Sequence, residues 1–456
     1  MEVDALKTWQ DLIEVGESEQ KRMEFVVAAV SAHKQTELYK IARDAEAYYA
    51  NHNVTIERFQ KTLRNIMGES VPDIFSANYK LKTAFFRRFV LQQTMYVLSN
   101  GVTFEKDETA AKLGADFENK LATLAKKAMV ASRSFGFWNL DHLEVFSFAD
   151  TPTDPGFVPL YDEETSLLRA GIRYSKNGDT ERYTLYEEDG YTEYIKLKDK
   201  DIKVYADKRS YVQKIRQTEA TGVEAVEGSN YPGFPIIPMY ANDLKQSEIV
   251  GIRESIDCYD FIKSGLANQI DDTSGFYWIL KGTGGMDDVD SQRFIERMKQ
   301  VRLAVLEPDM DAEAHTLEIP VEAREKLLDR LRNDMYEDFM LLDTEKALNG
   351  NITATGIRLA YQAQDDKCGD FEYHIRDFIA RLFALLNIED VPSFKWNRIA
   401  NQTEETNMVL AAANYLDDET VLKHLPWIST DEIDEIMQRK GELAITKFDP
   451  EPPVEE

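Results

Sequence analysis

The sequence has 456 residues, with 54 lysines and arginines against 82 aspartates and glutamates, which gives a formal net charge of −28. Electrostatics alone therefore argue against a protein that grips phosphate backbones. A hydrophobic content of 43% and an aromatic content of 11% can build a core and argue against disorder over most of the length.

Targeting signals and disulfides are not expected. No apolar run approaches the ~20 residues that a membrane span needs, and the acidic start of the chain does not read as a signal peptide. Cys258 and Cys368 are the only two cysteines. They make no disulfide framework, and they favour a reducing compartment and structural roles.

The first 140 residues read mainly as helices. Residues 4–50 are helical in pattern, and apolar residues recur at helical spacing over 76–98 until Asn100-Gly101 ends that helix. A further helix is expected over about 107–134, followed by an aromatic turn at 132–142. Arg87 and Arg88 could meet phosphate from the 76–98 helix, although a neighbouring acid is the more natural partner in so acidic a chain.

The pattern changes between 140 and 240. Short alternating segments rich in Val, Ile, Tyr and Thr are separated by Gly-Asp and Asp-Gly pairs, which predicts an antiparallel sheet with hairpins. The stretch at 228–243 carries several prolines and glycines and reads as a non-helical connector.

Two long helices then flank a small insert. One spans 246–273 and the other 320–343, and the α/β insert lies at about 275–318. Each helix carries one apolar stripe, formed by Ile249, Ile252, Ile256, Tyr259, Ile262, Leu266 and Ile270 in the first and by Leu328, Leu331, Met335, Phe339 and Leu342 in the second. This is the outline of a stalk that carries a tip.

An uncharged stretch with a glycine near each end follows the second stalk helix, "NGNITATG" at 349–356. A third long helix is expected over about 357–387. Residues 402–442 read as helical again, and the acidic tail at 444–456 reads as disordered.

Motifs for catalysis are lacking. "GTGG" at 282–285 has neither the P-loop nor the dinucleotide spacing, and the six histidines are scattered. Asp271 and Asp272, or Asp287, Asp288 and Asp290, could coordinate a cation, but they match no EF-hand, and in so acidic a chain solvated helix ends and turns are the better explanation. We therefore expect no catalytic residue, metal or cofactor, and a protein that works by assembly.

Four stretches carry a resemblance to a known family: 85–104, 235–285, 349–362 and 394–428. These stretches resemble the portal proteins of tailed double-stranded-DNA phages and follow one another in the same order as in that family. The resemblance is to the branch found in siphophages of Gram-positive bacteria. The resemblance implies a non-enzymatic α+β, mainly helical subunit of a ring, typically a dodecamer. Its regions would be a wing (1–240), stem helices (241–274 and 319–345), a clip (275–318), a tunnel loop with a long wing helix (346–399) and a crown (400–443).

The resemblance also implies a role and partners. The ring would sit at the portal vertex of the virion capsid after assembly in the host cytoplasm. It would nucleate the procapsid with scaffold and major capsid protein, dock the terminase large subunit, pass double-stranded DNA without binding it tightly, and later hold the head-tail connector (adaptor) protein. A metal-dependent nuclease using Asp287, Asp288 and Asp290, or another minor head protein, remains the alternative.

Site residues follow from the same resemblance. The channel loop that faces DNA would be Asn349, Gly350, Asn351, Ile352, Thr353, Ala354, Thr355 and Gly356. The clip, which docks the terminase, would use Tyr277, Trp278, Ile279, Leu280 and Lys281. Lys263, Lys326 and Arg330 are candidates for the stem channel wall.

Simple geometry is compatible with this role. Twelve helices about 9 Å apart make a ring about 34 Å across at their axes. Subtracting a helix thickness of about 10 Å leaves a bore of about 24 Å, which admits a duplex. An acidic wall would repel phosphates, and an uncharged loop would touch DNA without trapping it.

Overall fold

The computed structural model describes most of the chain, in two compact units. The first unit is Met1–Leu342 with Ala363–Trp396, and the second is Asp343–Gln362 with Asn397–Glu456. No helix among the described residues is both long and apolar enough to cross a membrane. The described residues are 6–64, 69–73, 76–198, 200–218, 222–271, 276–281, 290, 293, 311–316, 320–345, 354–397, 402–425, 428, 432–433 and 435–440.

Four helices open the first unit, as the sequence predicts. They are α1 (Trp9–Val15), α2 (Glu19–Gln35), α3 (Glu37–Tyr49) and the short α4 (Val54–Arg58). The side chains of Thr8, Thr36 and Asn53 accept hydrogen bonds from the free backbone N–H groups at the starts of α1, α3 and α4. Val26 and Ala29 of α2 are buried in one core cluster with residues of the sheet.

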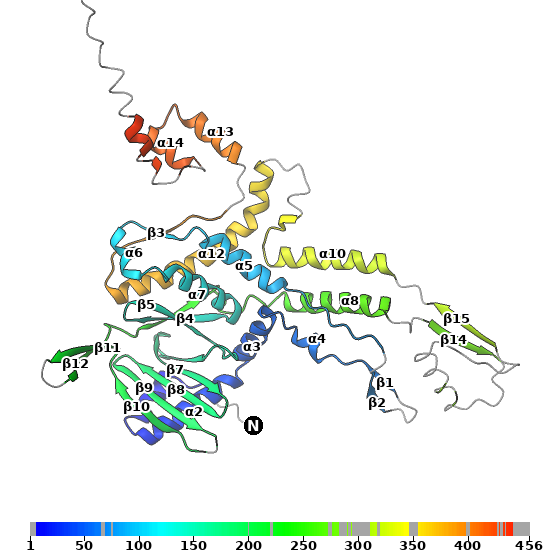
Figure 1. Ribbon diagram of the computed structural model, residues 1–456, viewed down its shortest axis with the longest axis horizontal. Helices are drawn as coiled ribbons and strands as arrows, with labels where there is room; N and C mark the ends of the chain where they lie inside the picture. The colour runs from blue at the N-terminus through cyan, green and yellow to red at the C-terminus, as the bar shows by residue number, and fades with distance from the viewer. Residues whose placement is uncertain are drawn as a thin grey trace, which may run out of the picture. The chain divides into compact units, whose positions relative to one another are not determined.

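The centre of this unit is an eight-stranded sheet (Figure 1) with the strand order β10-β9-β8-β7-β6-β5-β4-β13. Neighbouring strands are antiparallel except β5 and β6, which are parallel and meet at Ser147 and Gly156. The predicted antiparallel sheet is thus confirmed. Its strands are β4 (Arg133–Asn139), β5 (His142–Ser147), β6 (Gly156–Tyr161), β7 (Leu168–Asn177), β8 (Thr180–Glu187), β9 (Gly190–Leu197), β10 (Lys203–Arg209) and β13 (Ile236–Tyr240).

Two strands of this sheet correct the sequence analysis. The expected aromatic turn at 132–142 is largely β4, because Phe135 and Phe137 bury their rings in the core beside the sheet. The expected connector at 228–243 contains β13, which pairs with β4. A proline at 238 is tolerated there because β13 is an edge strand, where a missing N–H costs no ladder bond.

Helix α7 (Phe117–Ala131) packs on strands β4, β5 and β13 of the sheet, and α5 (Phe85–Leu98) packs on α7. Helix α6 (Asp107–Leu113) lies between them in the chain. The single helix expected over 107–134 is wrong, because the chain breaks at Gly114, which takes a left-handed φ of 81°. The helix expected over 76–98 begins only at Phe85. The preceding residues 77–84 have no regular secondary structure.

The long helix α12 (Ala354–Leu386) begins in the second unit, and its part from Ala363 onward completes the core of the first unit. Phe371, Ile375, Phe378 and Leu382 are all fully buried. A Cβ atom at Gly136 of β4 would come within 2.5 Å of the Phe378 ring, so a glycine at this point of the strand lets the helix approach the sheet.

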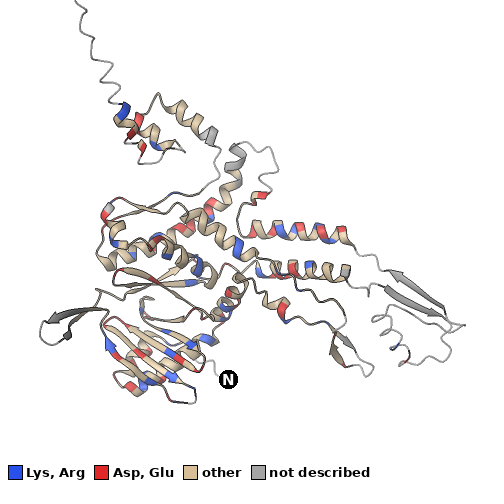
Figure 2. Ribbon diagram, viewed as in Figure 1, with Lys and Arg blue, Asp and Glu red and all other residues tan. Residues whose placement is uncertain are grey.

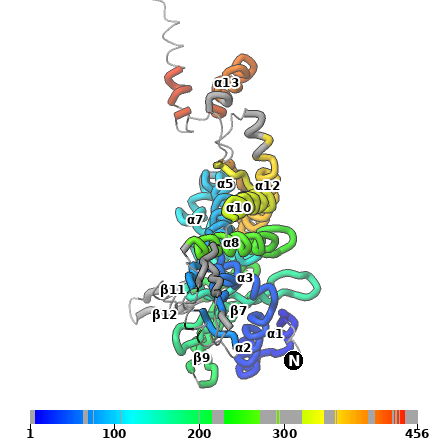
Figure 3. Tube along the Cα trace, turned by 90° about the vertical axis from the view of Figure 1, so that its right-hand side faces the viewer, coloured from blue at the N-terminus to red at the C-terminus, as the bar shows by residue number. Residues whose placement is uncertain are grey.

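The two predicted stalk helices exist as α8 (Arg253–Asp271) and α10 (Val321–Asp338). They lie side by side and antiparallel (Figures 1 and 3). Between them in sequence, β14 (Phe276–Lys281) and β15 (Asp311–Thr316) form an antiparallel hairpin in which Phe276 is paired with Thr316. Helix α10 ends earlier than expected, since Met340 takes a positive φ of 57°.

Three small two-stranded sheets and two further helices complete the described elements. The second unit contains α13 (Gln402–Ala412) and α14 (Asp418–His424), where the sequence predicts helices. The tail at 444–456 lies outside the described residues. The small sheets are β1 (Thr62–Arg64) with β2 (Ser70–Pro72), β3 (Val102–Phe104) with β16 (Pro392–Phe394), and β11 (Val212–Thr218) with β12 (Gly222–Ser229). The mixed α+β class is confirmed.

Candidate functional site

The predicted channel loop is only partly within the described residues. Asn349, Gly350, Asn351, Ile352 and Thr353 lie outside them. Ala354, Thr355 and Gly356 form the first turn of α12, so the loop is shorter than expected at this end. A glycine in a helix costs about 1 kcal/mol relative to alanine, which a 33-residue helix with a buried stripe can absorb. Whether these residues face DNA stays a prediction.

The predicted clip residues Tyr277, Trp278, Ile279, Leu280 and Lys281 lie on β14. Their register with β15 runs from Tyr277 opposite His315 to Lys281 opposite Asp311. The strand prediction is therefore confirmed at the level of the backbone. Their role in docking stays a prediction.

The stem helices rest on α5 through aromatic contacts. The ring of Phe85 meets that of Tyr259 on α8 at a centroid distance of 5.1 Å. Phe89 meets Tyr336 of α10 at 4.9 Å and Phe339 at 5.0 Å. These edge-on and tilted contacts are a favoured geometry for aromatic pairs, and they fix the end of the helix pair that lies nearest α5.

The apolar stripes of both helices lose their cover with distance from this end. On α8, Ile256 is 1% exposed, Ile262 and Leu266 are half-buried, and Ile270 is 69% exposed. On α10, Met335 is buried whereas Leu328 and Leu331 are half-buried. Within one chain, the ends of the helix pair nearest the β14–β15 hairpin therefore present apolar side chains without a complete core around them.

A second face of α8 holds the extended segment 77–84, which we call the strap. Its residues hydrogen-bond to polar side chains one helical turn apart. The backbone N–H of Tyr79 donates to Asn268 at 2.6 Å, and that of Leu81 donates to the Ser264 hydroxyl at 2.9 Å. The Thr83 hydroxyl donates to Asp260 at 2.7 Å. Backbone N–H groups of the strap thus find hydrogen-bond acceptors on α8. The strap therefore does not form the helix that its apolar spacing predicts.

Two acids of α8, the buried Asp260 and the half-buried Asp257, anchor this helix to the N-terminal helices as well. Asp260, which is fully buried, also accepts from Asn53 at 2.9 Å. Burial raises the pKa of Asp260, and the hydrogen bonds from Thr83 and Asn53 oppose that shift. Asp257 accepts from the hydroxyls of Tyr48 at 2.5 Å and Thr55 at 2.7 Å. The sequence analysis did not identify this network, although the four-residue spacing of Asp260, Ser264 and Asn268 is a signal for it.

The candidate wall residues occupy different environments. Lys263 on α8 is half-buried. Lys326 and Arg330 on α10 are exposed and pair along their own helix, Lys326 with Glu322 at 2.6 Å and Arg330 with Asp334 at 3.8 Å. Acidic and basic side chains alternate along α10 (Figure 2). Each of these two cations lies next to an acid of the same helix. The surface of α10 therefore carries many charges without a strong excess of one sign.

The remaining residues considered in the sequence analysis are the aspartates that could bind a cation, two arginines of α5 and the two cysteines. Asp290 is exposed, and Asp272, Asp287 and Asp288 lie outside the described residues. Asp271 ends α8. Arg87 and Arg88 are exposed on α5, with the Arg88 guanidinium 5.6 Å from the centroid of the Phe85 ring. Cys258 is exposed, whereas burial raises the pKa of the Cys368 thiol to about 12.

Comparisons with known proteins agree with the resemblance seen in the sequence. A family model described as "Phage portal protein, SPP1 Gp6-like" matches residues 28–444. The chain is 23% identical over 447 residues to the portal protein of Clostridium phage phiCD119, covering 91% of this chain and 94% of that protein. It is 24% identical over 344 residues to the portal protein of Bacillus phage SPP1, covering 72% of this chain and 66% of that protein.

Solved structures show a more distant likeness. Against "Neck of native GTA particle computed with C12 symmetry" the TM-score is 0.39 at 12% identity, covering 76% of this chain and 90% of that chain. Against "Neck of empty GTA particle computed with C6 symmetry" it is also 0.39 at 12% identity, covering 74% and 88%.

The family match extends over most of the chain and defines a class of structural, non-enzymatic virion proteins. The chain belongs to the SPP1 Gp6-like phage portal protein family. This membership confirms the family expected from the sequence. It also confirms the expectation of a virion component without catalytic activity.

Proposed function

We propose that the chain assembles into a ring, typically of twelve copies, at one vertex of the capsid. The ring is the conduit for DNA during packaging and ejection. It nucleates the procapsid with scaffold and major capsid protein, docks the terminase large subunit and later holds the head-tail connector protein. Membership of the portal family carries this proposal, and the features of α8 and α10 support it.

The uncovered apolar stripe supports assembly through the stem. Ile270 of the α8 stripe is 69% exposed at the far end of the helix, and Leu327, next to Leu328 of the α10 stripe, is 44% exposed. Burial of such side chains is worth about 1.5–3 kcal/mol each, so leaving them in water is costly. The α8 and α10 of neighbouring copies supply a partner of the same kind, since helices pack side by side at 8–10 Å.

The charge pattern supports passage of DNA without tight binding. A channel wall whose cations neutralise several phosphates would bind DNA tightly, with a strong dependence on salt, and would impede its movement. Lys326 and Arg330, the candidate wall cations of α10, already pair with acids of their own helix, and the chain as a whole carries a net charge of −28. In this proposal Lys263, Lys326 and Arg330 touch DNA only transiently.

The hairpin and the start of α12 are assigned by the family resemblance. The β14 strand with Tyr277, Trp278, Ile279, Leu280 and Lys281 belongs to the clip, where strands of neighbouring copies and the terminase dock. Residues 349–356 reach into the channel between the stem and α12. A short uncharged segment gives van der Waals contact with DNA and no electrostatic trap.

The first experiment is the mass and symmetry of the purified full chain, by native mass spectrometry and negative-stain imaging. A closed ring with a central hole, near twelvefold, is the expected result. A compact dimer or tetramer would overturn the proposal. A deletion of residues 276–308 tests the clip separately: closed rings that still bind the terminase would show that the clip is assigned wrongly.

A further inference from the structure

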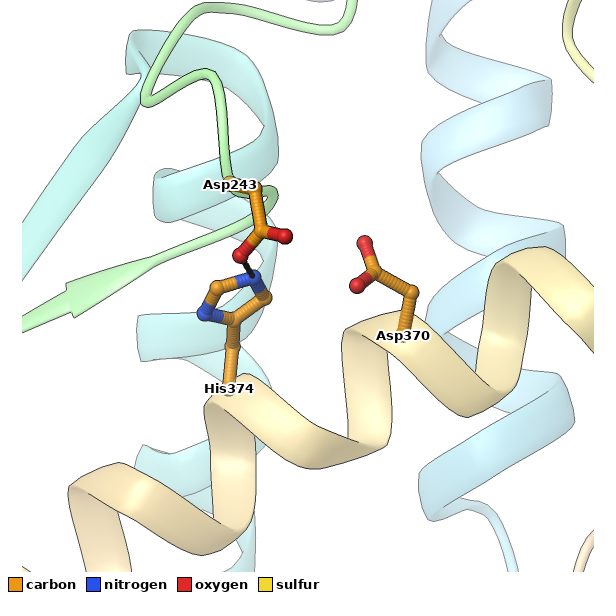
Figure 4. A group of neighbouring side chains, drawn as sticks. All are labelled: Asp243, Asp370 and His374. Carbon is orange, nitrogen blue, oxygen red and sulfur yellow. Dashed lines mark ion pairs between the residues drawn. The ribbon is translucent and has the colours of Figure 1, made fainter.

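Three side chains with metal-binding groups converge in the first unit (Figure 4). Asp370 and His374 lie one turn apart on α12, so both project from the same face of the helix. Asp243 lies in the turn that follows β13 and faces them from the opposite side. The sequence analysis expected no metal site and did not single out any of the three.

The imidazole of His374 is in an unusual position for a histidine on a helix surface. Its side chain is only 12% exposed, and its Nε2 atom is shielded from solvent without a hydrogen-bond partner. The atom lies 3.4 Å from Oδ1 of Asp243, which is an ion pair only if the ring is protonated. A shielded ring nitrogen that makes no hydrogen bond is costly, and it calls for an explanation.

We propose that Asp243, Asp370 and His374 bind a divalent first-row transition-metal ion, with Zn²⁺ as the reference ion. Two ligands on bonds of about 2.1 Å in a tetrahedral site lie about 3.4 Å apart, which matches the separation of the His374 and Asp243 atoms. One ligand atom from each of the three residues lies within 4.8 Å of the others. Binding to one ion would draw the three atoms closer together than this limit.

The donor set selects the class of ion. One imidazole and two carboxylates suit Zn²⁺, Mn²⁺ or a related ion, whereas Ca²⁺ and Mg²⁺ prefer sites made of oxygen alone. The Asp243 side chain is 85% exposed, so water completes the coordination sphere from that side.

The loop that carries Asp243 is tied to α12 beside the cluster. Asn242, next to Asp243, donates to the Gln246 carbonyl at 3.0 Å and to Glu248 at 2.7 Å. Glu248 in turn pairs with Lys367, one turn before Asp370 on α12, at 2.7 Å. The same ion pair therefore fastens the loop to the helix beside the ligands. A bound ion would add a second tie between α12 and the loop that leads into α8.

The test uses the full chain, stripped of metal with a chelator. Zn²⁺ is titrated by calorimetry, and Co²⁺ is titrated by its visible absorption. We expect one site per chain and binding at least tenfold weaker in His374→Ala and Asp370→Asn. Asp377→Asn and His52→Ala, which remove a carboxylate of α12 and an exposed histidine outside the cluster, should bind as the unchanged chain does.

Circular dichroism spectra and melting temperatures, both recorded in the presence of chelator, verify that each variant is folded. Asp243→Asn changes an exposed loop residue and keeps the test informative if a helix variant folds poorly. Zn²⁺ should raise the melting temperature of the unchanged chain and of the two controls but not of the three ligand variants. Equal Zn²⁺ affinity in His374→Ala and the unchanged chain, or no saturable site in the unchanged chain, would overturn the proposal.

Discussion

The buried carboxylate of Asp260 on α8 accepts a hydrogen bond of 2.7 Å from the hydroxyl of Thr83 in the strap. Its other oxygen accepts from Asn53, at the start of α4. One side chain of a stem helix thereby joins two segments that lie far from it in the sequence. This joint helps to orient α8 in its unit, together with the neighbouring contact of Tyr259 with Phe85 and the hydrogen bonds of Asp257.

Asp260→Ala should lower the free energy of unfolding by about 2–3 kcal/mol, because it leaves the donors of the buried Asn53 and the half-buried Thr83 without an acceptor. Urea denaturation measures the change. A double-mutant cycle with Thr83→Val should give a coupling of about 1 kcal/mol. Glu254→Ala, which removes an exposed carboxylate of the same helix, is the matched control. Additive effects of the Asp260 and Thr83 substitutions would contradict the joint.

His33 should make the stability of the chain depend on pH. The ring is buried against Phe148, whose carbonyl oxygen lies 3.1 Å from Nε2. Burial lowers its pKa from 6.5 to about 4, with Arg133 and Lys34 adding to the shift while the Phe148 carbonyl and Asp150 oppose it. As the pH falls, His33 is therefore protonated in the unfolded chain before it is protonated in the folded chain. Proton binding then shifts the folding equilibrium toward the unfolded state.

The stabilisation is thus complete above pH 6.5 and is lost between 6.5 and about 4. Relative to His33→Gln, the unchanged chain should lose about 3 kcal/mol of unfolding free energy between pH 7 and pH 4. Chemical denaturation at a series of pH values measures this difference. A difference between the two proteins that stays constant with pH would rule out the assigned role of His33.

The strap marks where sequence patterns fail. Leu81 falls in register with Phe85 and Phe89, so apolar periodicity extends the predicted helix over the strap. The structure begins the helix at Phe85, because the backbone of the strap bonds to Ser264 and Asn268 on α8. Those partners lie more than 180 residues away in sequence. A local pattern contains no information about such a contact.

Elsewhere the local signals sufficed, with errors at the ends of elements. Alternation predicted the antiparallel sheet, and the apolar stripes predicted α8 and α10. The break at Gly114 and the early end of the loop before α12 were missed, since a glycine is compatible with a helix, a cap or a turn. The His374 cluster was missed because Asp243 is 127 residues from Asp370 in the sequence, and only the fold brings them together.

Ile270→Glu should separate folding from assembly. The side chain is 69% exposed in one chain, so the substitution should change the free energy of unfolding by no more than about 0.5 kcal/mol. It places a charge in the proposed contact between neighbouring stems and should sharply reduce the yield of rings in native mass spectra. Ile256→Glu, at a buried position of the same stripe, should instead destabilise the chain itself. Normal ring yield with Ile270→Glu would remove this contact from the proposed interface.

Bulk or charge in the segment before α12 should impair DNA packaging without preventing ring assembly. Ile352→Lys would place one cation per copy around the proposed channel, and added phosphate contacts should slow packaging roughly tenfold. Ala354→Trp would act through its size. The measurement is nuclease-protected DNA per particle, alongside ring yield. Tyr373→Lys, an exposed position of α12 outside this segment, is the control for added charge. Normal packaging by both loop variants would mean that residues 349–356 do not contact DNA, and that their uncharged character serves only the connection into α12.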